Sequence, residues 1–470
     1  MKLVFEQSVQ GRMAITLPAS NVPSYTLQCA TRKTQADLSE ISEIDLVRHY
    51  TRLGKQVYGV DNGFYPLGSC TMKYNPRLNE QVVELEGFNN VHPTQCPCET
   101  KGTIEVMTNM QQDLCAITGM DYVTLQPAAG AHGEFCGMLL IKKYHQSRGD
   151  TLRKKIIVPD SAHGTNPASA NMCGFEIVTV SSNKEGGVDI DNLKQIVGPD
   201  TAGLMLTNPN TLGLFDKNIL SITRIIHDAG GLCYYDGANL NAIMGMCRPG
   251  DMGFDCVHLN IHKTFSAPHG GGGPGSGPVG CKQMLAKFLP TPIIGKQPTV
   301  EYSLGKVKSY CGNFPVILRG YTYIKTLGSS GLKQASQLAV LNANYLRILL
   351  QQDYTTAIDR ICMHEFVLDV KDYHDNYSTS ALDISKTMID YGMHPPTMYF
   401  PLIVHEALMF EPTETESKQT LEEVAEIMHK ISIRAKDSQD DLHASPVTTP
   451  IGRVDEVKAA RQPILKYQPQ

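Results

Sequence analysis

The chain has 470 residues and a formal net charge of −5, with 41% hydrophobic and 19% charged residues. This length predicts two or three domains with a large buried core, and the composition is that of an ordinary globular protein. The acidic balance gives no electrostatic basis for binding nucleic acid, and no apolar run approaches the roughly 18 residues of a membrane span.

The N-terminus and the cysteines indicate a cytoplasmic protein. Glu6 lies where a signal peptide needs its apolar core, and the first residues are not rich in arginine and serine, as a transit peptide would be. The 13 cysteines are an odd number scattered over a long chain, which is typical of reduced thiols. We therefore expect a cytoplasmic location.

Residues 1–75 are expected to form an N-terminal arm that lies on another surface. Proline and glycine punctuate this segment, with an amphipathic helix near residues 37–50 and a polar, turn-rich stretch at residues 65–76. Such a segment is too poor in regular elements to pack alone.

His92, Cys96 and Cys98 lie close together in the sequence and could be imagined as metal ligands. The two cysteines are separated by a proline, and no second pair follows at zinc-site spacing. We expect no metal site.

From about residue 120 to residue 285 the pattern is that of repeated βαβ units, and the expected large α/β domain spans residues 76–330. A helix at residues 103–118 precedes these units, and a helix that includes Ile219, Ile222 and Ile226 lies within them. The apolar segments predict strands at residues 123–125, 155–158, 176–180, 203–207 and 232–235, and one that begins at residue 257.

Polar side chains follow the carboxyl ends of these predicted strands. The residues that do so are His163, Asn210, Asp236, Asn239 and, at a tight turn before a glycine run at 270–273, His262 and Lys263. Ligands bind at this edge of an open parallel sheet, so residues that are distant in sequence should share one crevice.

Residues 128–133 are small apart from His132 and open a helix after the first strand. Such a turn suits a phosphate because free N–H groups and the positive end of the helix dipole point at the anion. A simple tight strand-to-helix turn explains the same residues. Residues 275–280 match the spacing GxGxxG, but they follow a glycine loop instead of a strand, and Pro278 removes a donor. We expect this stretch to let backbone pass close to a ligand, not to bind a dinucleotide.

A smaller α+β domain is expected at residues 331–440, after a helix-like stretch at residues 319–325. Its expected elements are a strand at 365–370 and helices at 332–350, 380–391 and 415–437. The tail, residues 441–470, which carries Pro446, Pro450 and Pro463, should be extended.

A lysine, an aspartate and a histidine at separate strand ends, beside a phosphate-type turn, together suit pyridoxal phosphate. Lys263 would hold the aldehyde as an imine, Asp236 would keep the ring nitrogen protonated, and His163 would stack on the ring. Each residue also has an ordinary explanation, as a loop lysine, a helix cap and a satisfied buried histidine. Four such coincidences at one sheet edge favour the cofactor.

The sequence resembles the P-protein family of the glycine cleavage system, in particular the second subunit of its two-chain form, over nearly the whole chain. The matching motifs are at residues 65–76, 92–95, 126–134, 160–168, 207–215, 235–239, 258–278, 328–332, 394–397 and 410–417. The resemblance implies an α/β fold of the fold type I, aspartate aminotransferase-like class of PLP-dependent transferases, with a large parallel or mixed sheet and a smaller C-terminal domain.

The resemblance also implies residue roles. Lys263 would bind pyridoxal 5′-phosphate covalently, Asp236 would pair with the ring nitrogen, and His163 would stack on the ring. The other cofactor contacts implied are Gly130, Ala131 and His132 at the phosphate and, as neighbours of the phenolate and phosphate, Asn210, Asn239 and His262.

The activity implied is glycine dehydrogenase (aminomethyl-transferring), in which glycine is decarboxylated and its aminomethyl group passes to the lipoyl group of H-protein. The implied partners are subunit 1, in an α2β2 heterotetramer, and H-protein; neither nucleic acid nor a membrane is expected. No arginine falls in a motif that can be assigned to the glycine carboxylate, and part of the site can belong to the companion subunit.

Two alternatives remain open at this stage. One is another fold type I enzyme, such as an aminotransferase or a desulfurase, although no cysteine lies where a desulfurase carries its mobile one. The other is a non-catalytic partner subunit, against which the retention of Lys263, Asp236 and His163 argues.

Overall fold

The computed structural model describes residues 2–34, 36, 38–92, 95–270, 275–294 and 302–466. Pro93 and Thr94 of one family motif and positions 271–273 of the glycine run lie outside the described residues, as does Asp37 at the start of the expected first helix. The chain divides into two compact units, one made of Met1–Asn62 with Arg453–Gln470 and the other of Gly63–Gly452.

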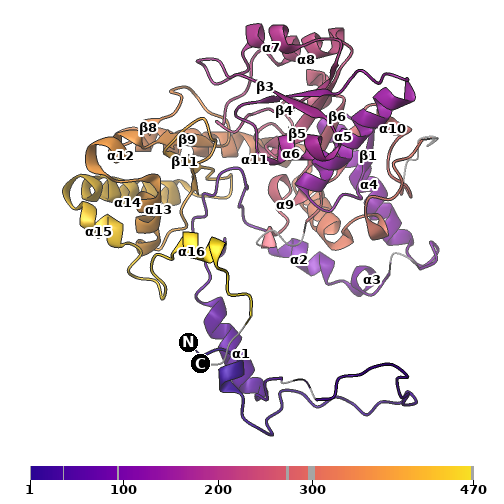
Figure 1. The fold of residues 1–470 in the computed structure, drawn as a ribbon, viewed down its shortest axis with the longest axis vertical. Coiled ribbons are helices and arrows are strands. Elements are labelled where there is room, and N and C mark those ends of the chain that lie inside the picture. The colour runs from indigo at the N-terminus through magenta and orange to yellow at the C-terminus, as the bar shows by residue number, and fades with distance from the viewer. Residues whose placement is uncertain are drawn as a thin grey trace. The chain divides into compact units, whose positions relative to one another are not determined.

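The second unit is built around a mixed seven-stranded sheet with the order β1-β7-β6-β5-β4-β2-β3 (Figure 1). Strands β3, β2, β4, β5 and β6 are parallel, whereas β7 is antiparallel to both β6 and β1. The strands are β1 (Tyr122–Thr124), β2 (Lys155–Pro159), β3 (Glu176–Val180), β4 (Thr201–Thr207), β5 (Leu232–Gly237), β6 (Cys256–Leu259) and β7 (Val279–Cys281). The expected α/β class is confirmed.

Helices cover both faces of this sheet, because neighbouring residues of each central strand point to opposite sides. Leu204, Tyr235 and Val257 pack on one side with α4 (Lys101–Thr118), α8 (Ile219–Asp228) and the start of α11 (Phe314–Leu350). Met205, Tyr234 and Cys256 pack on the other with α5 (Gly130–Ser147) and α6 (Thr165–Met172). The remaining elements here are α2 (Arg77–Val83), α3 (Glu86–Asn89), α7 (Ile190–Ile196), α9 (Ile261–Thr264), α10 (Gln283–Ala286) and the 3-10 turns Leu240–Ala242, Pro249–Met252 and Ser309–Cys311.

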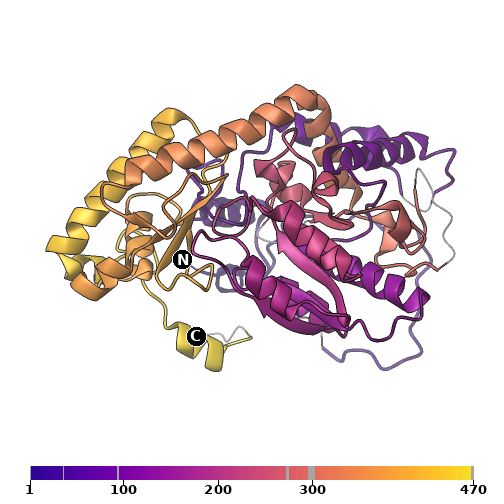
Figure 2. The same cartoon turned by 90° about the horizontal axis from the view of Figure 1, so that it is seen from above.

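The long helix α11 leads from the large sheet to a second, smaller sheet (Figure 2). The sequence suggested two helices here, at 319–325 and 332–350; both belong to α11, which is interrupted at Gly328, where φ is 61°. Glycine reaches this left-handed value without a Cβ clash, so the helix can resume after one residue.

The smaller sheet is antiparallel, with the order β10-β11-β9-β8. Its strands are β8 (Thr355–Thr356), β9 (Phe366–Asp369), β10 (Thr397–Met398) and β11 (Ala407–Phe410), and its helices are α12 (Lys371–Tyr377), α13 (Ala381–Asp390), α14 (Lys418–Asp437) and α15 (Gln439–Ala444). Ser380 and Asp383 form a capping box that starts α13, and Ser417 caps α14. A separate apolar core lies between these helices and the small sheet.

The first unit contains the 3-10 turn Phe5–Gln7, α1 (Glu43–Gly54) and α16 (Glu456–Arg461). Helix α1 begins later than expected because Ser42 caps it by accepting from the N–H of Asp45. Contrary to the expectation of an extended tail, α16 is helical, with Asp455 accepting from the N–H of Lys458. None of the described helices combines the length and the apolar character that crossing a bilayer requires.

Candidate active site

A cavity of about 660 Å³ opens at the carboxyl edge of the large sheet. Its described lining combines residues from strand ends of that sheet with residues of the segments 67–70 and 397–400. The lining residues that matter for its chemistry are Ser69, Cys70, Gly130, Ala131, Glu134, His163, Thr165, Asp236, Asn239, His258, Asn260, His262, Lys263, His269, Thr397 and Phe400. Among these described lining residues there is no arginine.

Lys263 reaches this cavity from α9, the short helical turn that follows β6. Its Nζ donates a hydrogen bond of 2.7 Å to the carbonyl oxygen of Ser69, a residue 194 positions away in the sequence. Lys263 is half-buried, and this hydrogen bond holds its amine at the cavity wall.

Asp236 lies near the end of β5 and is 3% exposed. Oδ2 accepts from Asn166 Nδ2 at 2.9 Å, Oδ1 accepts from the N–H of Ala238 at 2.9 Å, and His258 Nε2 lies 3.4 Å from Oδ1. Burial disfavours ionisation, but the neighbouring His258, these two hydrogen bonds and Lys263 more than offset it, so the pKa of Asp236 lies below its usual value. The cavity thus contains a buried carboxylate.

His163 stands exposed in the cavity wall, and a relay of hydrogen bonds fixes its ring. Its Nδ1 lies 2.8 Å from Thr165 Oγ1, and that hydroxyl donates to Glu134 Oε1 at 2.8 Å. Glu134 is buried and also accepts from Ser169 at 3.0 Å. A ring held from behind in this way offers a flat face of defined orientation.

The turn expected to bind phosphate is the N-terminus of the 18-residue helix α5, and its Gly130 and Ala131 line the cavity. A Cβ on Gly130 would lie 2.6 Å from Asn260 Nδ2, so glycine allows this close approach. His132 is outside the described lining, and its Nδ1 accepts from the N–H of Ala128 at 3.1 Å. Gly275 lines the cavity, and the N–H of Gly277 donates to the Pro127 carbonyl at 2.9 Å, so the glycine-rich stretch packs on this turn.

The three residues expected beside the phenolate and phosphate, His262, Asn239 and Asn210, lie in different settings. His262 lines the cavity; burial and the nearby Lys263, His269 and His258 lower its pKa to about 3, and its buried Nδ1 has no hydrogen-bond partner among the described residues. Asn239 also lines the cavity, and its Nδ2 donates to Glu365 Oε1 at 3.1 Å.

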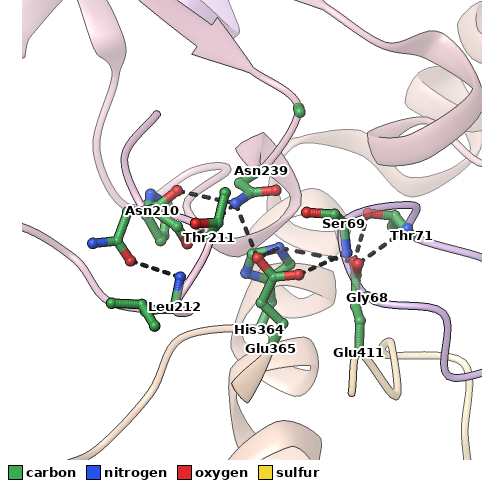
Figure 3. A network of polar contacts seen from close by, with 12 residues as sticks. Gly68, Ser69, Thr71, Asn210, Thr211, Leu212, Asn239, His364, Glu365 and Glu411 are labelled. Atoms are coloured by element: carbon green, nitrogen blue, oxygen red, sulfur yellow. Dashed lines mark hydrogen bonds and ion pairs between the residues drawn. The ribbon is translucent and has the colours of Figure 1, made fainter. Parts of the chain in front are cut away.

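The side chain of Asn210 forms its hydrogen bonds with backbone groups of its own and a neighbouring loop (Figure 3). Its Nδ2 donates to the Gly186 carbonyl at 2.6 Å, and its Oδ1 accepts from the N–H groups of Leu212 and Leu214. It is not among the described lining residues.

Sequence reasoning did not single out several residues that shape the site. His258 lies within the buried strand β6, where its Nδ1 contacts Tyr234 Oη at 2.6 Å and its Nε2 contacts Asn260 Oδ1 at 2.9 Å; a histidine inside an apolar strand was the available signal. Ser69 belongs to a polar motif that had no assigned role, and Phe400 offered no signal at all.

The lining fits pyridoxal phosphate on its own chemistry. A helix N-terminus with small residues suits the phosphate, a buried carboxylate suits a pyridinium nitrogen, and a primary amine lies in the same cavity. The buried Nδ1 of His262, which has no partner among the described residues, adds a polar atom for a ligand to satisfy.

Comparison with known proteins gives a consistent family. The model of the glycine cleavage system P-protein matches residues 16–301, and that of the glycine dehydrogenase C-terminal domain matches residues 335–447. A probable glycine dehydrogenase (decarboxylating) subunit 2 of Treponema denticola is 59% identical, covering 99% of this chain and 98% of the relative. The protein of the same name from Caldanaerobacter subterraneus is 55% identical, with 99% and 98% coverage.

Solved structures share the fold. A glycine decarboxylase (P-protein) crystal structure in inhibitor-bound form has a TM-score of 0.71 at 18% identity, covering 87% of this chain and 93% of that one. The sphingosine-1-phosphate lyase of Burkholderia pseudomallei has a TM-score of 0.63 at 12% identity, covering 89% of this chain and 96% of that one. The fold type I class expected from the sequence is confirmed.

Proposed function

This chain belongs to the glycine cleavage system P-protein family, and from that premise we propose that it is the cofactor-bearing subunit of a glycine decarboxylase. In this role it decarboxylates glycine and transfers the aminomethyl group to the lipoyl group of H-protein, the activity of a glycine dehydrogenase (aminomethyl-transferring). The observation that carries the proposal is the meeting of Lys263, Asp236, His163 and the α5 N-terminus in one cavity.

The cofactor is pyridoxal 5′-phosphate, bound covalently to Lys263. When bound, it supplies a sink for the electron pair released as carbon dioxide leaves glycine. The ionised Asp236 holds a proton on the ring nitrogen through a charge-assisted hydrogen bond. His163, fixed through Thr165, presents its ring face to the cofactor.

The phosphate is held by the N-terminus of α5 at Gly130 and Ala131, with His132 stabilising the preceding turn. His262 stays neutral at physiological pH, because its pKa is about 3, and can exchange a hydrogen bond without carrying charge. Asn239 lies at the edge of this group, and Asn210 supports the site by shaping its loop. Lys263, or a nearby histidine such as His269, moves the protons.

The relatives are named as subunit 2, which implies a companion subunit. We assign the assembly as an α2β2 heterotetramer that receives lipoylated H-protein. We assign an N-terminal arm to residues 1–75, a large domain to 76–330, a small domain to 331–440 and a tail to 441–470. The arm supports this because large apolar side chains are exposed along it, including Met13, Ile15, Leu17, Val22 and Tyr25. Burying such a surface is typical of an obligate interface.

The cytoplasm is the compartment in which we place this activity. None of the 13 cysteines, all of which lie among the described residues, forms a disulfide, which suits a reducing environment.

The test of the proposal is covalent labelling of Lys263. Purified protein given pyridoxal phosphate should absorb in the visible range of an imine, and borohydride reduction followed by peptide mass analysis should place the label on Lys263. Lys263→Ala should give no label while keeping the fold. A label on any other lysine would refute the assignment of the cofactor site.

A further inference from the structure

Two fully buried glutamates beside the small sheet, Glu365 and Glu411, accept hydrogen bonds from the loop that contains Ser69 and Thr71 (Figure 3). Glu365 precedes β9 and Glu411 follows β11. These strands are antiparallel, with Phe366 opposite Phe410, so the register places Glu365 and Glu411 at the next step of the same ladder. The carboxyl groups are neighbours because of this register.

The carboxyl groups bind the backbone of the loop at two alternate residues. Glu365 Oε2 accepts from the N–H of Ser69 at 2.8 Å. Glu411 Oε2 accepts from the N–H of Thr71 at 3.0 Å, and its Oε1 accepts from the Thr71 hydroxyl at 2.5 Å. Each glutamate thus holds one residue of the loop.

Ser69 and Thr71 are also the residues of this loop with left-handed backbone, at φ values of 64° and 47°. Residues with a Cβ avoid this region, and a threonine does so especially, because its side chain is β-branched. The conformation persists only where the surroundings impose it, and the buried carboxyl groups provide that constraint.

The loop held by the two glutamates contacts the amine of Lys263, the lysine proposed to bind the cofactor. While the Ser69 N–H is bonded to Glu365, the Ser69 carbonyl accepts from Lys263 Nζ at 2.7 Å. Glu365 is itself fixed, since its Oε1 accepts from Asn239 at 3.1 Å. Behind it, Gly213 comes so close to the Glu365 carbonyl that a Cβ there would lie 1.8 Å from the oxygen.

The carboxyl groups of Glu365 and Glu411 are not both ionised at neutral pH. Burial raises the pKa of Glu365 well above its usual value, and the neighbouring Glu411 adds to the rise. Burial likewise raises the pKa of Glu411 to about 7. His364, whose Nε2 lies 3.8 Å from Glu411 Oε1, has its pKa lowered to about 3 by burial and by the charges of Lys263 and Lys73, so it brings no compensating charge. The pair therefore retains a proton, and the hydrogen bonds place it on Glu411, because the Thr71 hydroxyl can turn to accept whereas both partners of Glu365 are donors.

We propose that Glu365 and Glu411 are positioning residues for Lys263, which hold the Ser69–Thr71 turn so that the Ser69 carbonyl receives the lysine's ammonium group whenever that lysine is not bonded to the cofactor. The inference rests on the proposed function of Lys263. When glycine's amino group replaces the lysine on the cofactor, one imine bond would form as the other breaks, and the protons given up by glycine's ammonium group would leave the lysine as an ammonium group that needs an acceptor. A fixed Ser69 carbonyl that accepts from this ammonium group favours the state in which glycine has replaced Lys263.

Hydrogen-bond counting predicts opposite responses to the same substitution at the two positions. Glu365 accepts from the Ser69 N–H and from Asn239 Nδ2, and the Asn239 amide cannot turn over without losing the bond of 3.0 Å that the same Nδ2 donates to the Pro209 carbonyl. In Glu365→Gln the amide NH2 must therefore face a donor. Glu411 accepts from one N–H and one hydroxyl, and the hydroxyl can turn to accept from the amide in Glu411→Gln. The first substitution should disturb the turn, and the second should preserve it.

The experiment is a glycine titration of the cofactor-loaded complex with its companion subunit, without H-protein. The visible absorption change that marks replacement of the lysine by glycine gives an apparent Kd, independent of turnover. Glu365→Gln should raise this Kd about 10- to 100-fold, the worth of a hydrogen bond to a charged group. Borohydride should still label Lys263, and Glu411→Gln should titrate within about threefold of wild type.

Glu406→Gln is the matched control. Glu406 is a buried glutamate just before β11 that accepts from the N–H of Ala381 at 2.8 Å, away from the turn, so this variant should keep the wild-type Kd. If Glu365→Gln does not fold, Glu365→Asp, which withdraws the carboxylate by one methylene, should raise the Kd in its place.

A wild-type Kd in Glu365→Gln or its substitute would overturn the inference, and so would an equal rise in Glu406→Gln, because general loosening would then explain both. Failure to label Lys263 in the wild-type protein is a different result, since it removes the proposed function itself.

Discussion

Replacing Asp236 by asparagine should leave the fold intact and remove most of the activity. Asp236 Oδ1 accepts from the N–H of Ala238, which an asparagine oxygen can also do. Its Oδ2 accepts from Asn166 Nδ2, and Asn166 Oδ1 is buried without a partner among the described residues. Rotation of the Asn166 amide would therefore present an acceptor to the new NH2 group, so stability should fall by only about 1 kcal/mol.

The cost to catalysis follows from the lost charge. The bond from a carboxylate to a protonated ring nitrogen is charge-assisted, and such bonds are worth about 1.5–3 kcal/mol. At about 1.4 kcal/mol for each factor of ten, activity should fall by roughly 10- to 150-fold from this term alone. The lower pKa of Asp236 supports the premise that the group is ionised at neutral pH.

The assay is exchange of the carboxyl carbon of glycine with labelled bicarbonate, in the presence of H-protein and the companion subunit. Borohydride labelling of Lys263 confirms that the variant is loaded. The matched control is Asp255→Asn, because Asp255 is a buried aspartate that accepts from the Cys233 N–H and contacts His227 Nε2, each at 2.8 Å, and it does not line the cavity. Near wild-type exchange by loaded Asp236→Asn would refute the role of Asp236 in electron withdrawal.

Three further outcomes are expected. Lys73→Met should lower the free energy of unfolding in denaturant by about 3–5 kcal/mol, because Lys73 and Glu414 form a buried ion pair at 2.7 Å. Lys325→Met removes a more exposed ion pair, with Asp113, and should cost less than about 1 kcal/mol. Equal costs for the two substitutions would contradict this reasoning. Burial raises the pKa of Glu416 from 4.5 to about 7, so its contribution to stability is complete below pH 4.5 and is lost as the pH rises toward 7. Glu416→Gln should remove this part of the pH dependence of thermal unfolding. An unchanged dependence of the melting temperature on pH would contradict the prediction. The chain alone should give almost no bicarbonate exchange until the companion subunit is added, and full exchange from the chain alone would end the two-subunit proposal.

The large sheet could be predicted because its strands carry local signals. β4 and β6 are buried along their whole length, and turn residues bound them, so short apolar runs marked them within two residues. Parallel strands then bring their carboxyl ends to one edge, which is why His163, Asp236 and Lys263 line one cavity although about 100 residues separate the first from the last.

The rest of the site depends on contacts that no local pattern encodes. Ser69 and Lys263 form a hydrogen bond although 194 positions separate them in the sequence, and Thr71 and Glu411 do so although 340 positions separate them. The sequence marks residues 65–76 only as a polar, turn-rich stretch without an assigned role, because its partners lie in distant parts of the chain. The continuity of α11 was also missed: the two helices expected at 319–325 and 332–350 join across one left-handed residue, Gly328, instead of being separated by a loop.

Glu365 and Glu411 illustrate what a single sequence cannot state. Each follows or precedes an apolar strand, and each alone would be expected to face solvent. Only the register of β9 against β11, with Phe366 opposite Phe410, brings both carboxyl groups to one buried position. A slip of one residue would turn one of the two strands over and carry its carboxyl group to the other face of the sheet. The turn at Ser69 and Thr71 would then lose one of its two acceptors, so the register of the small sheet is itself a condition for where Lys263 rests.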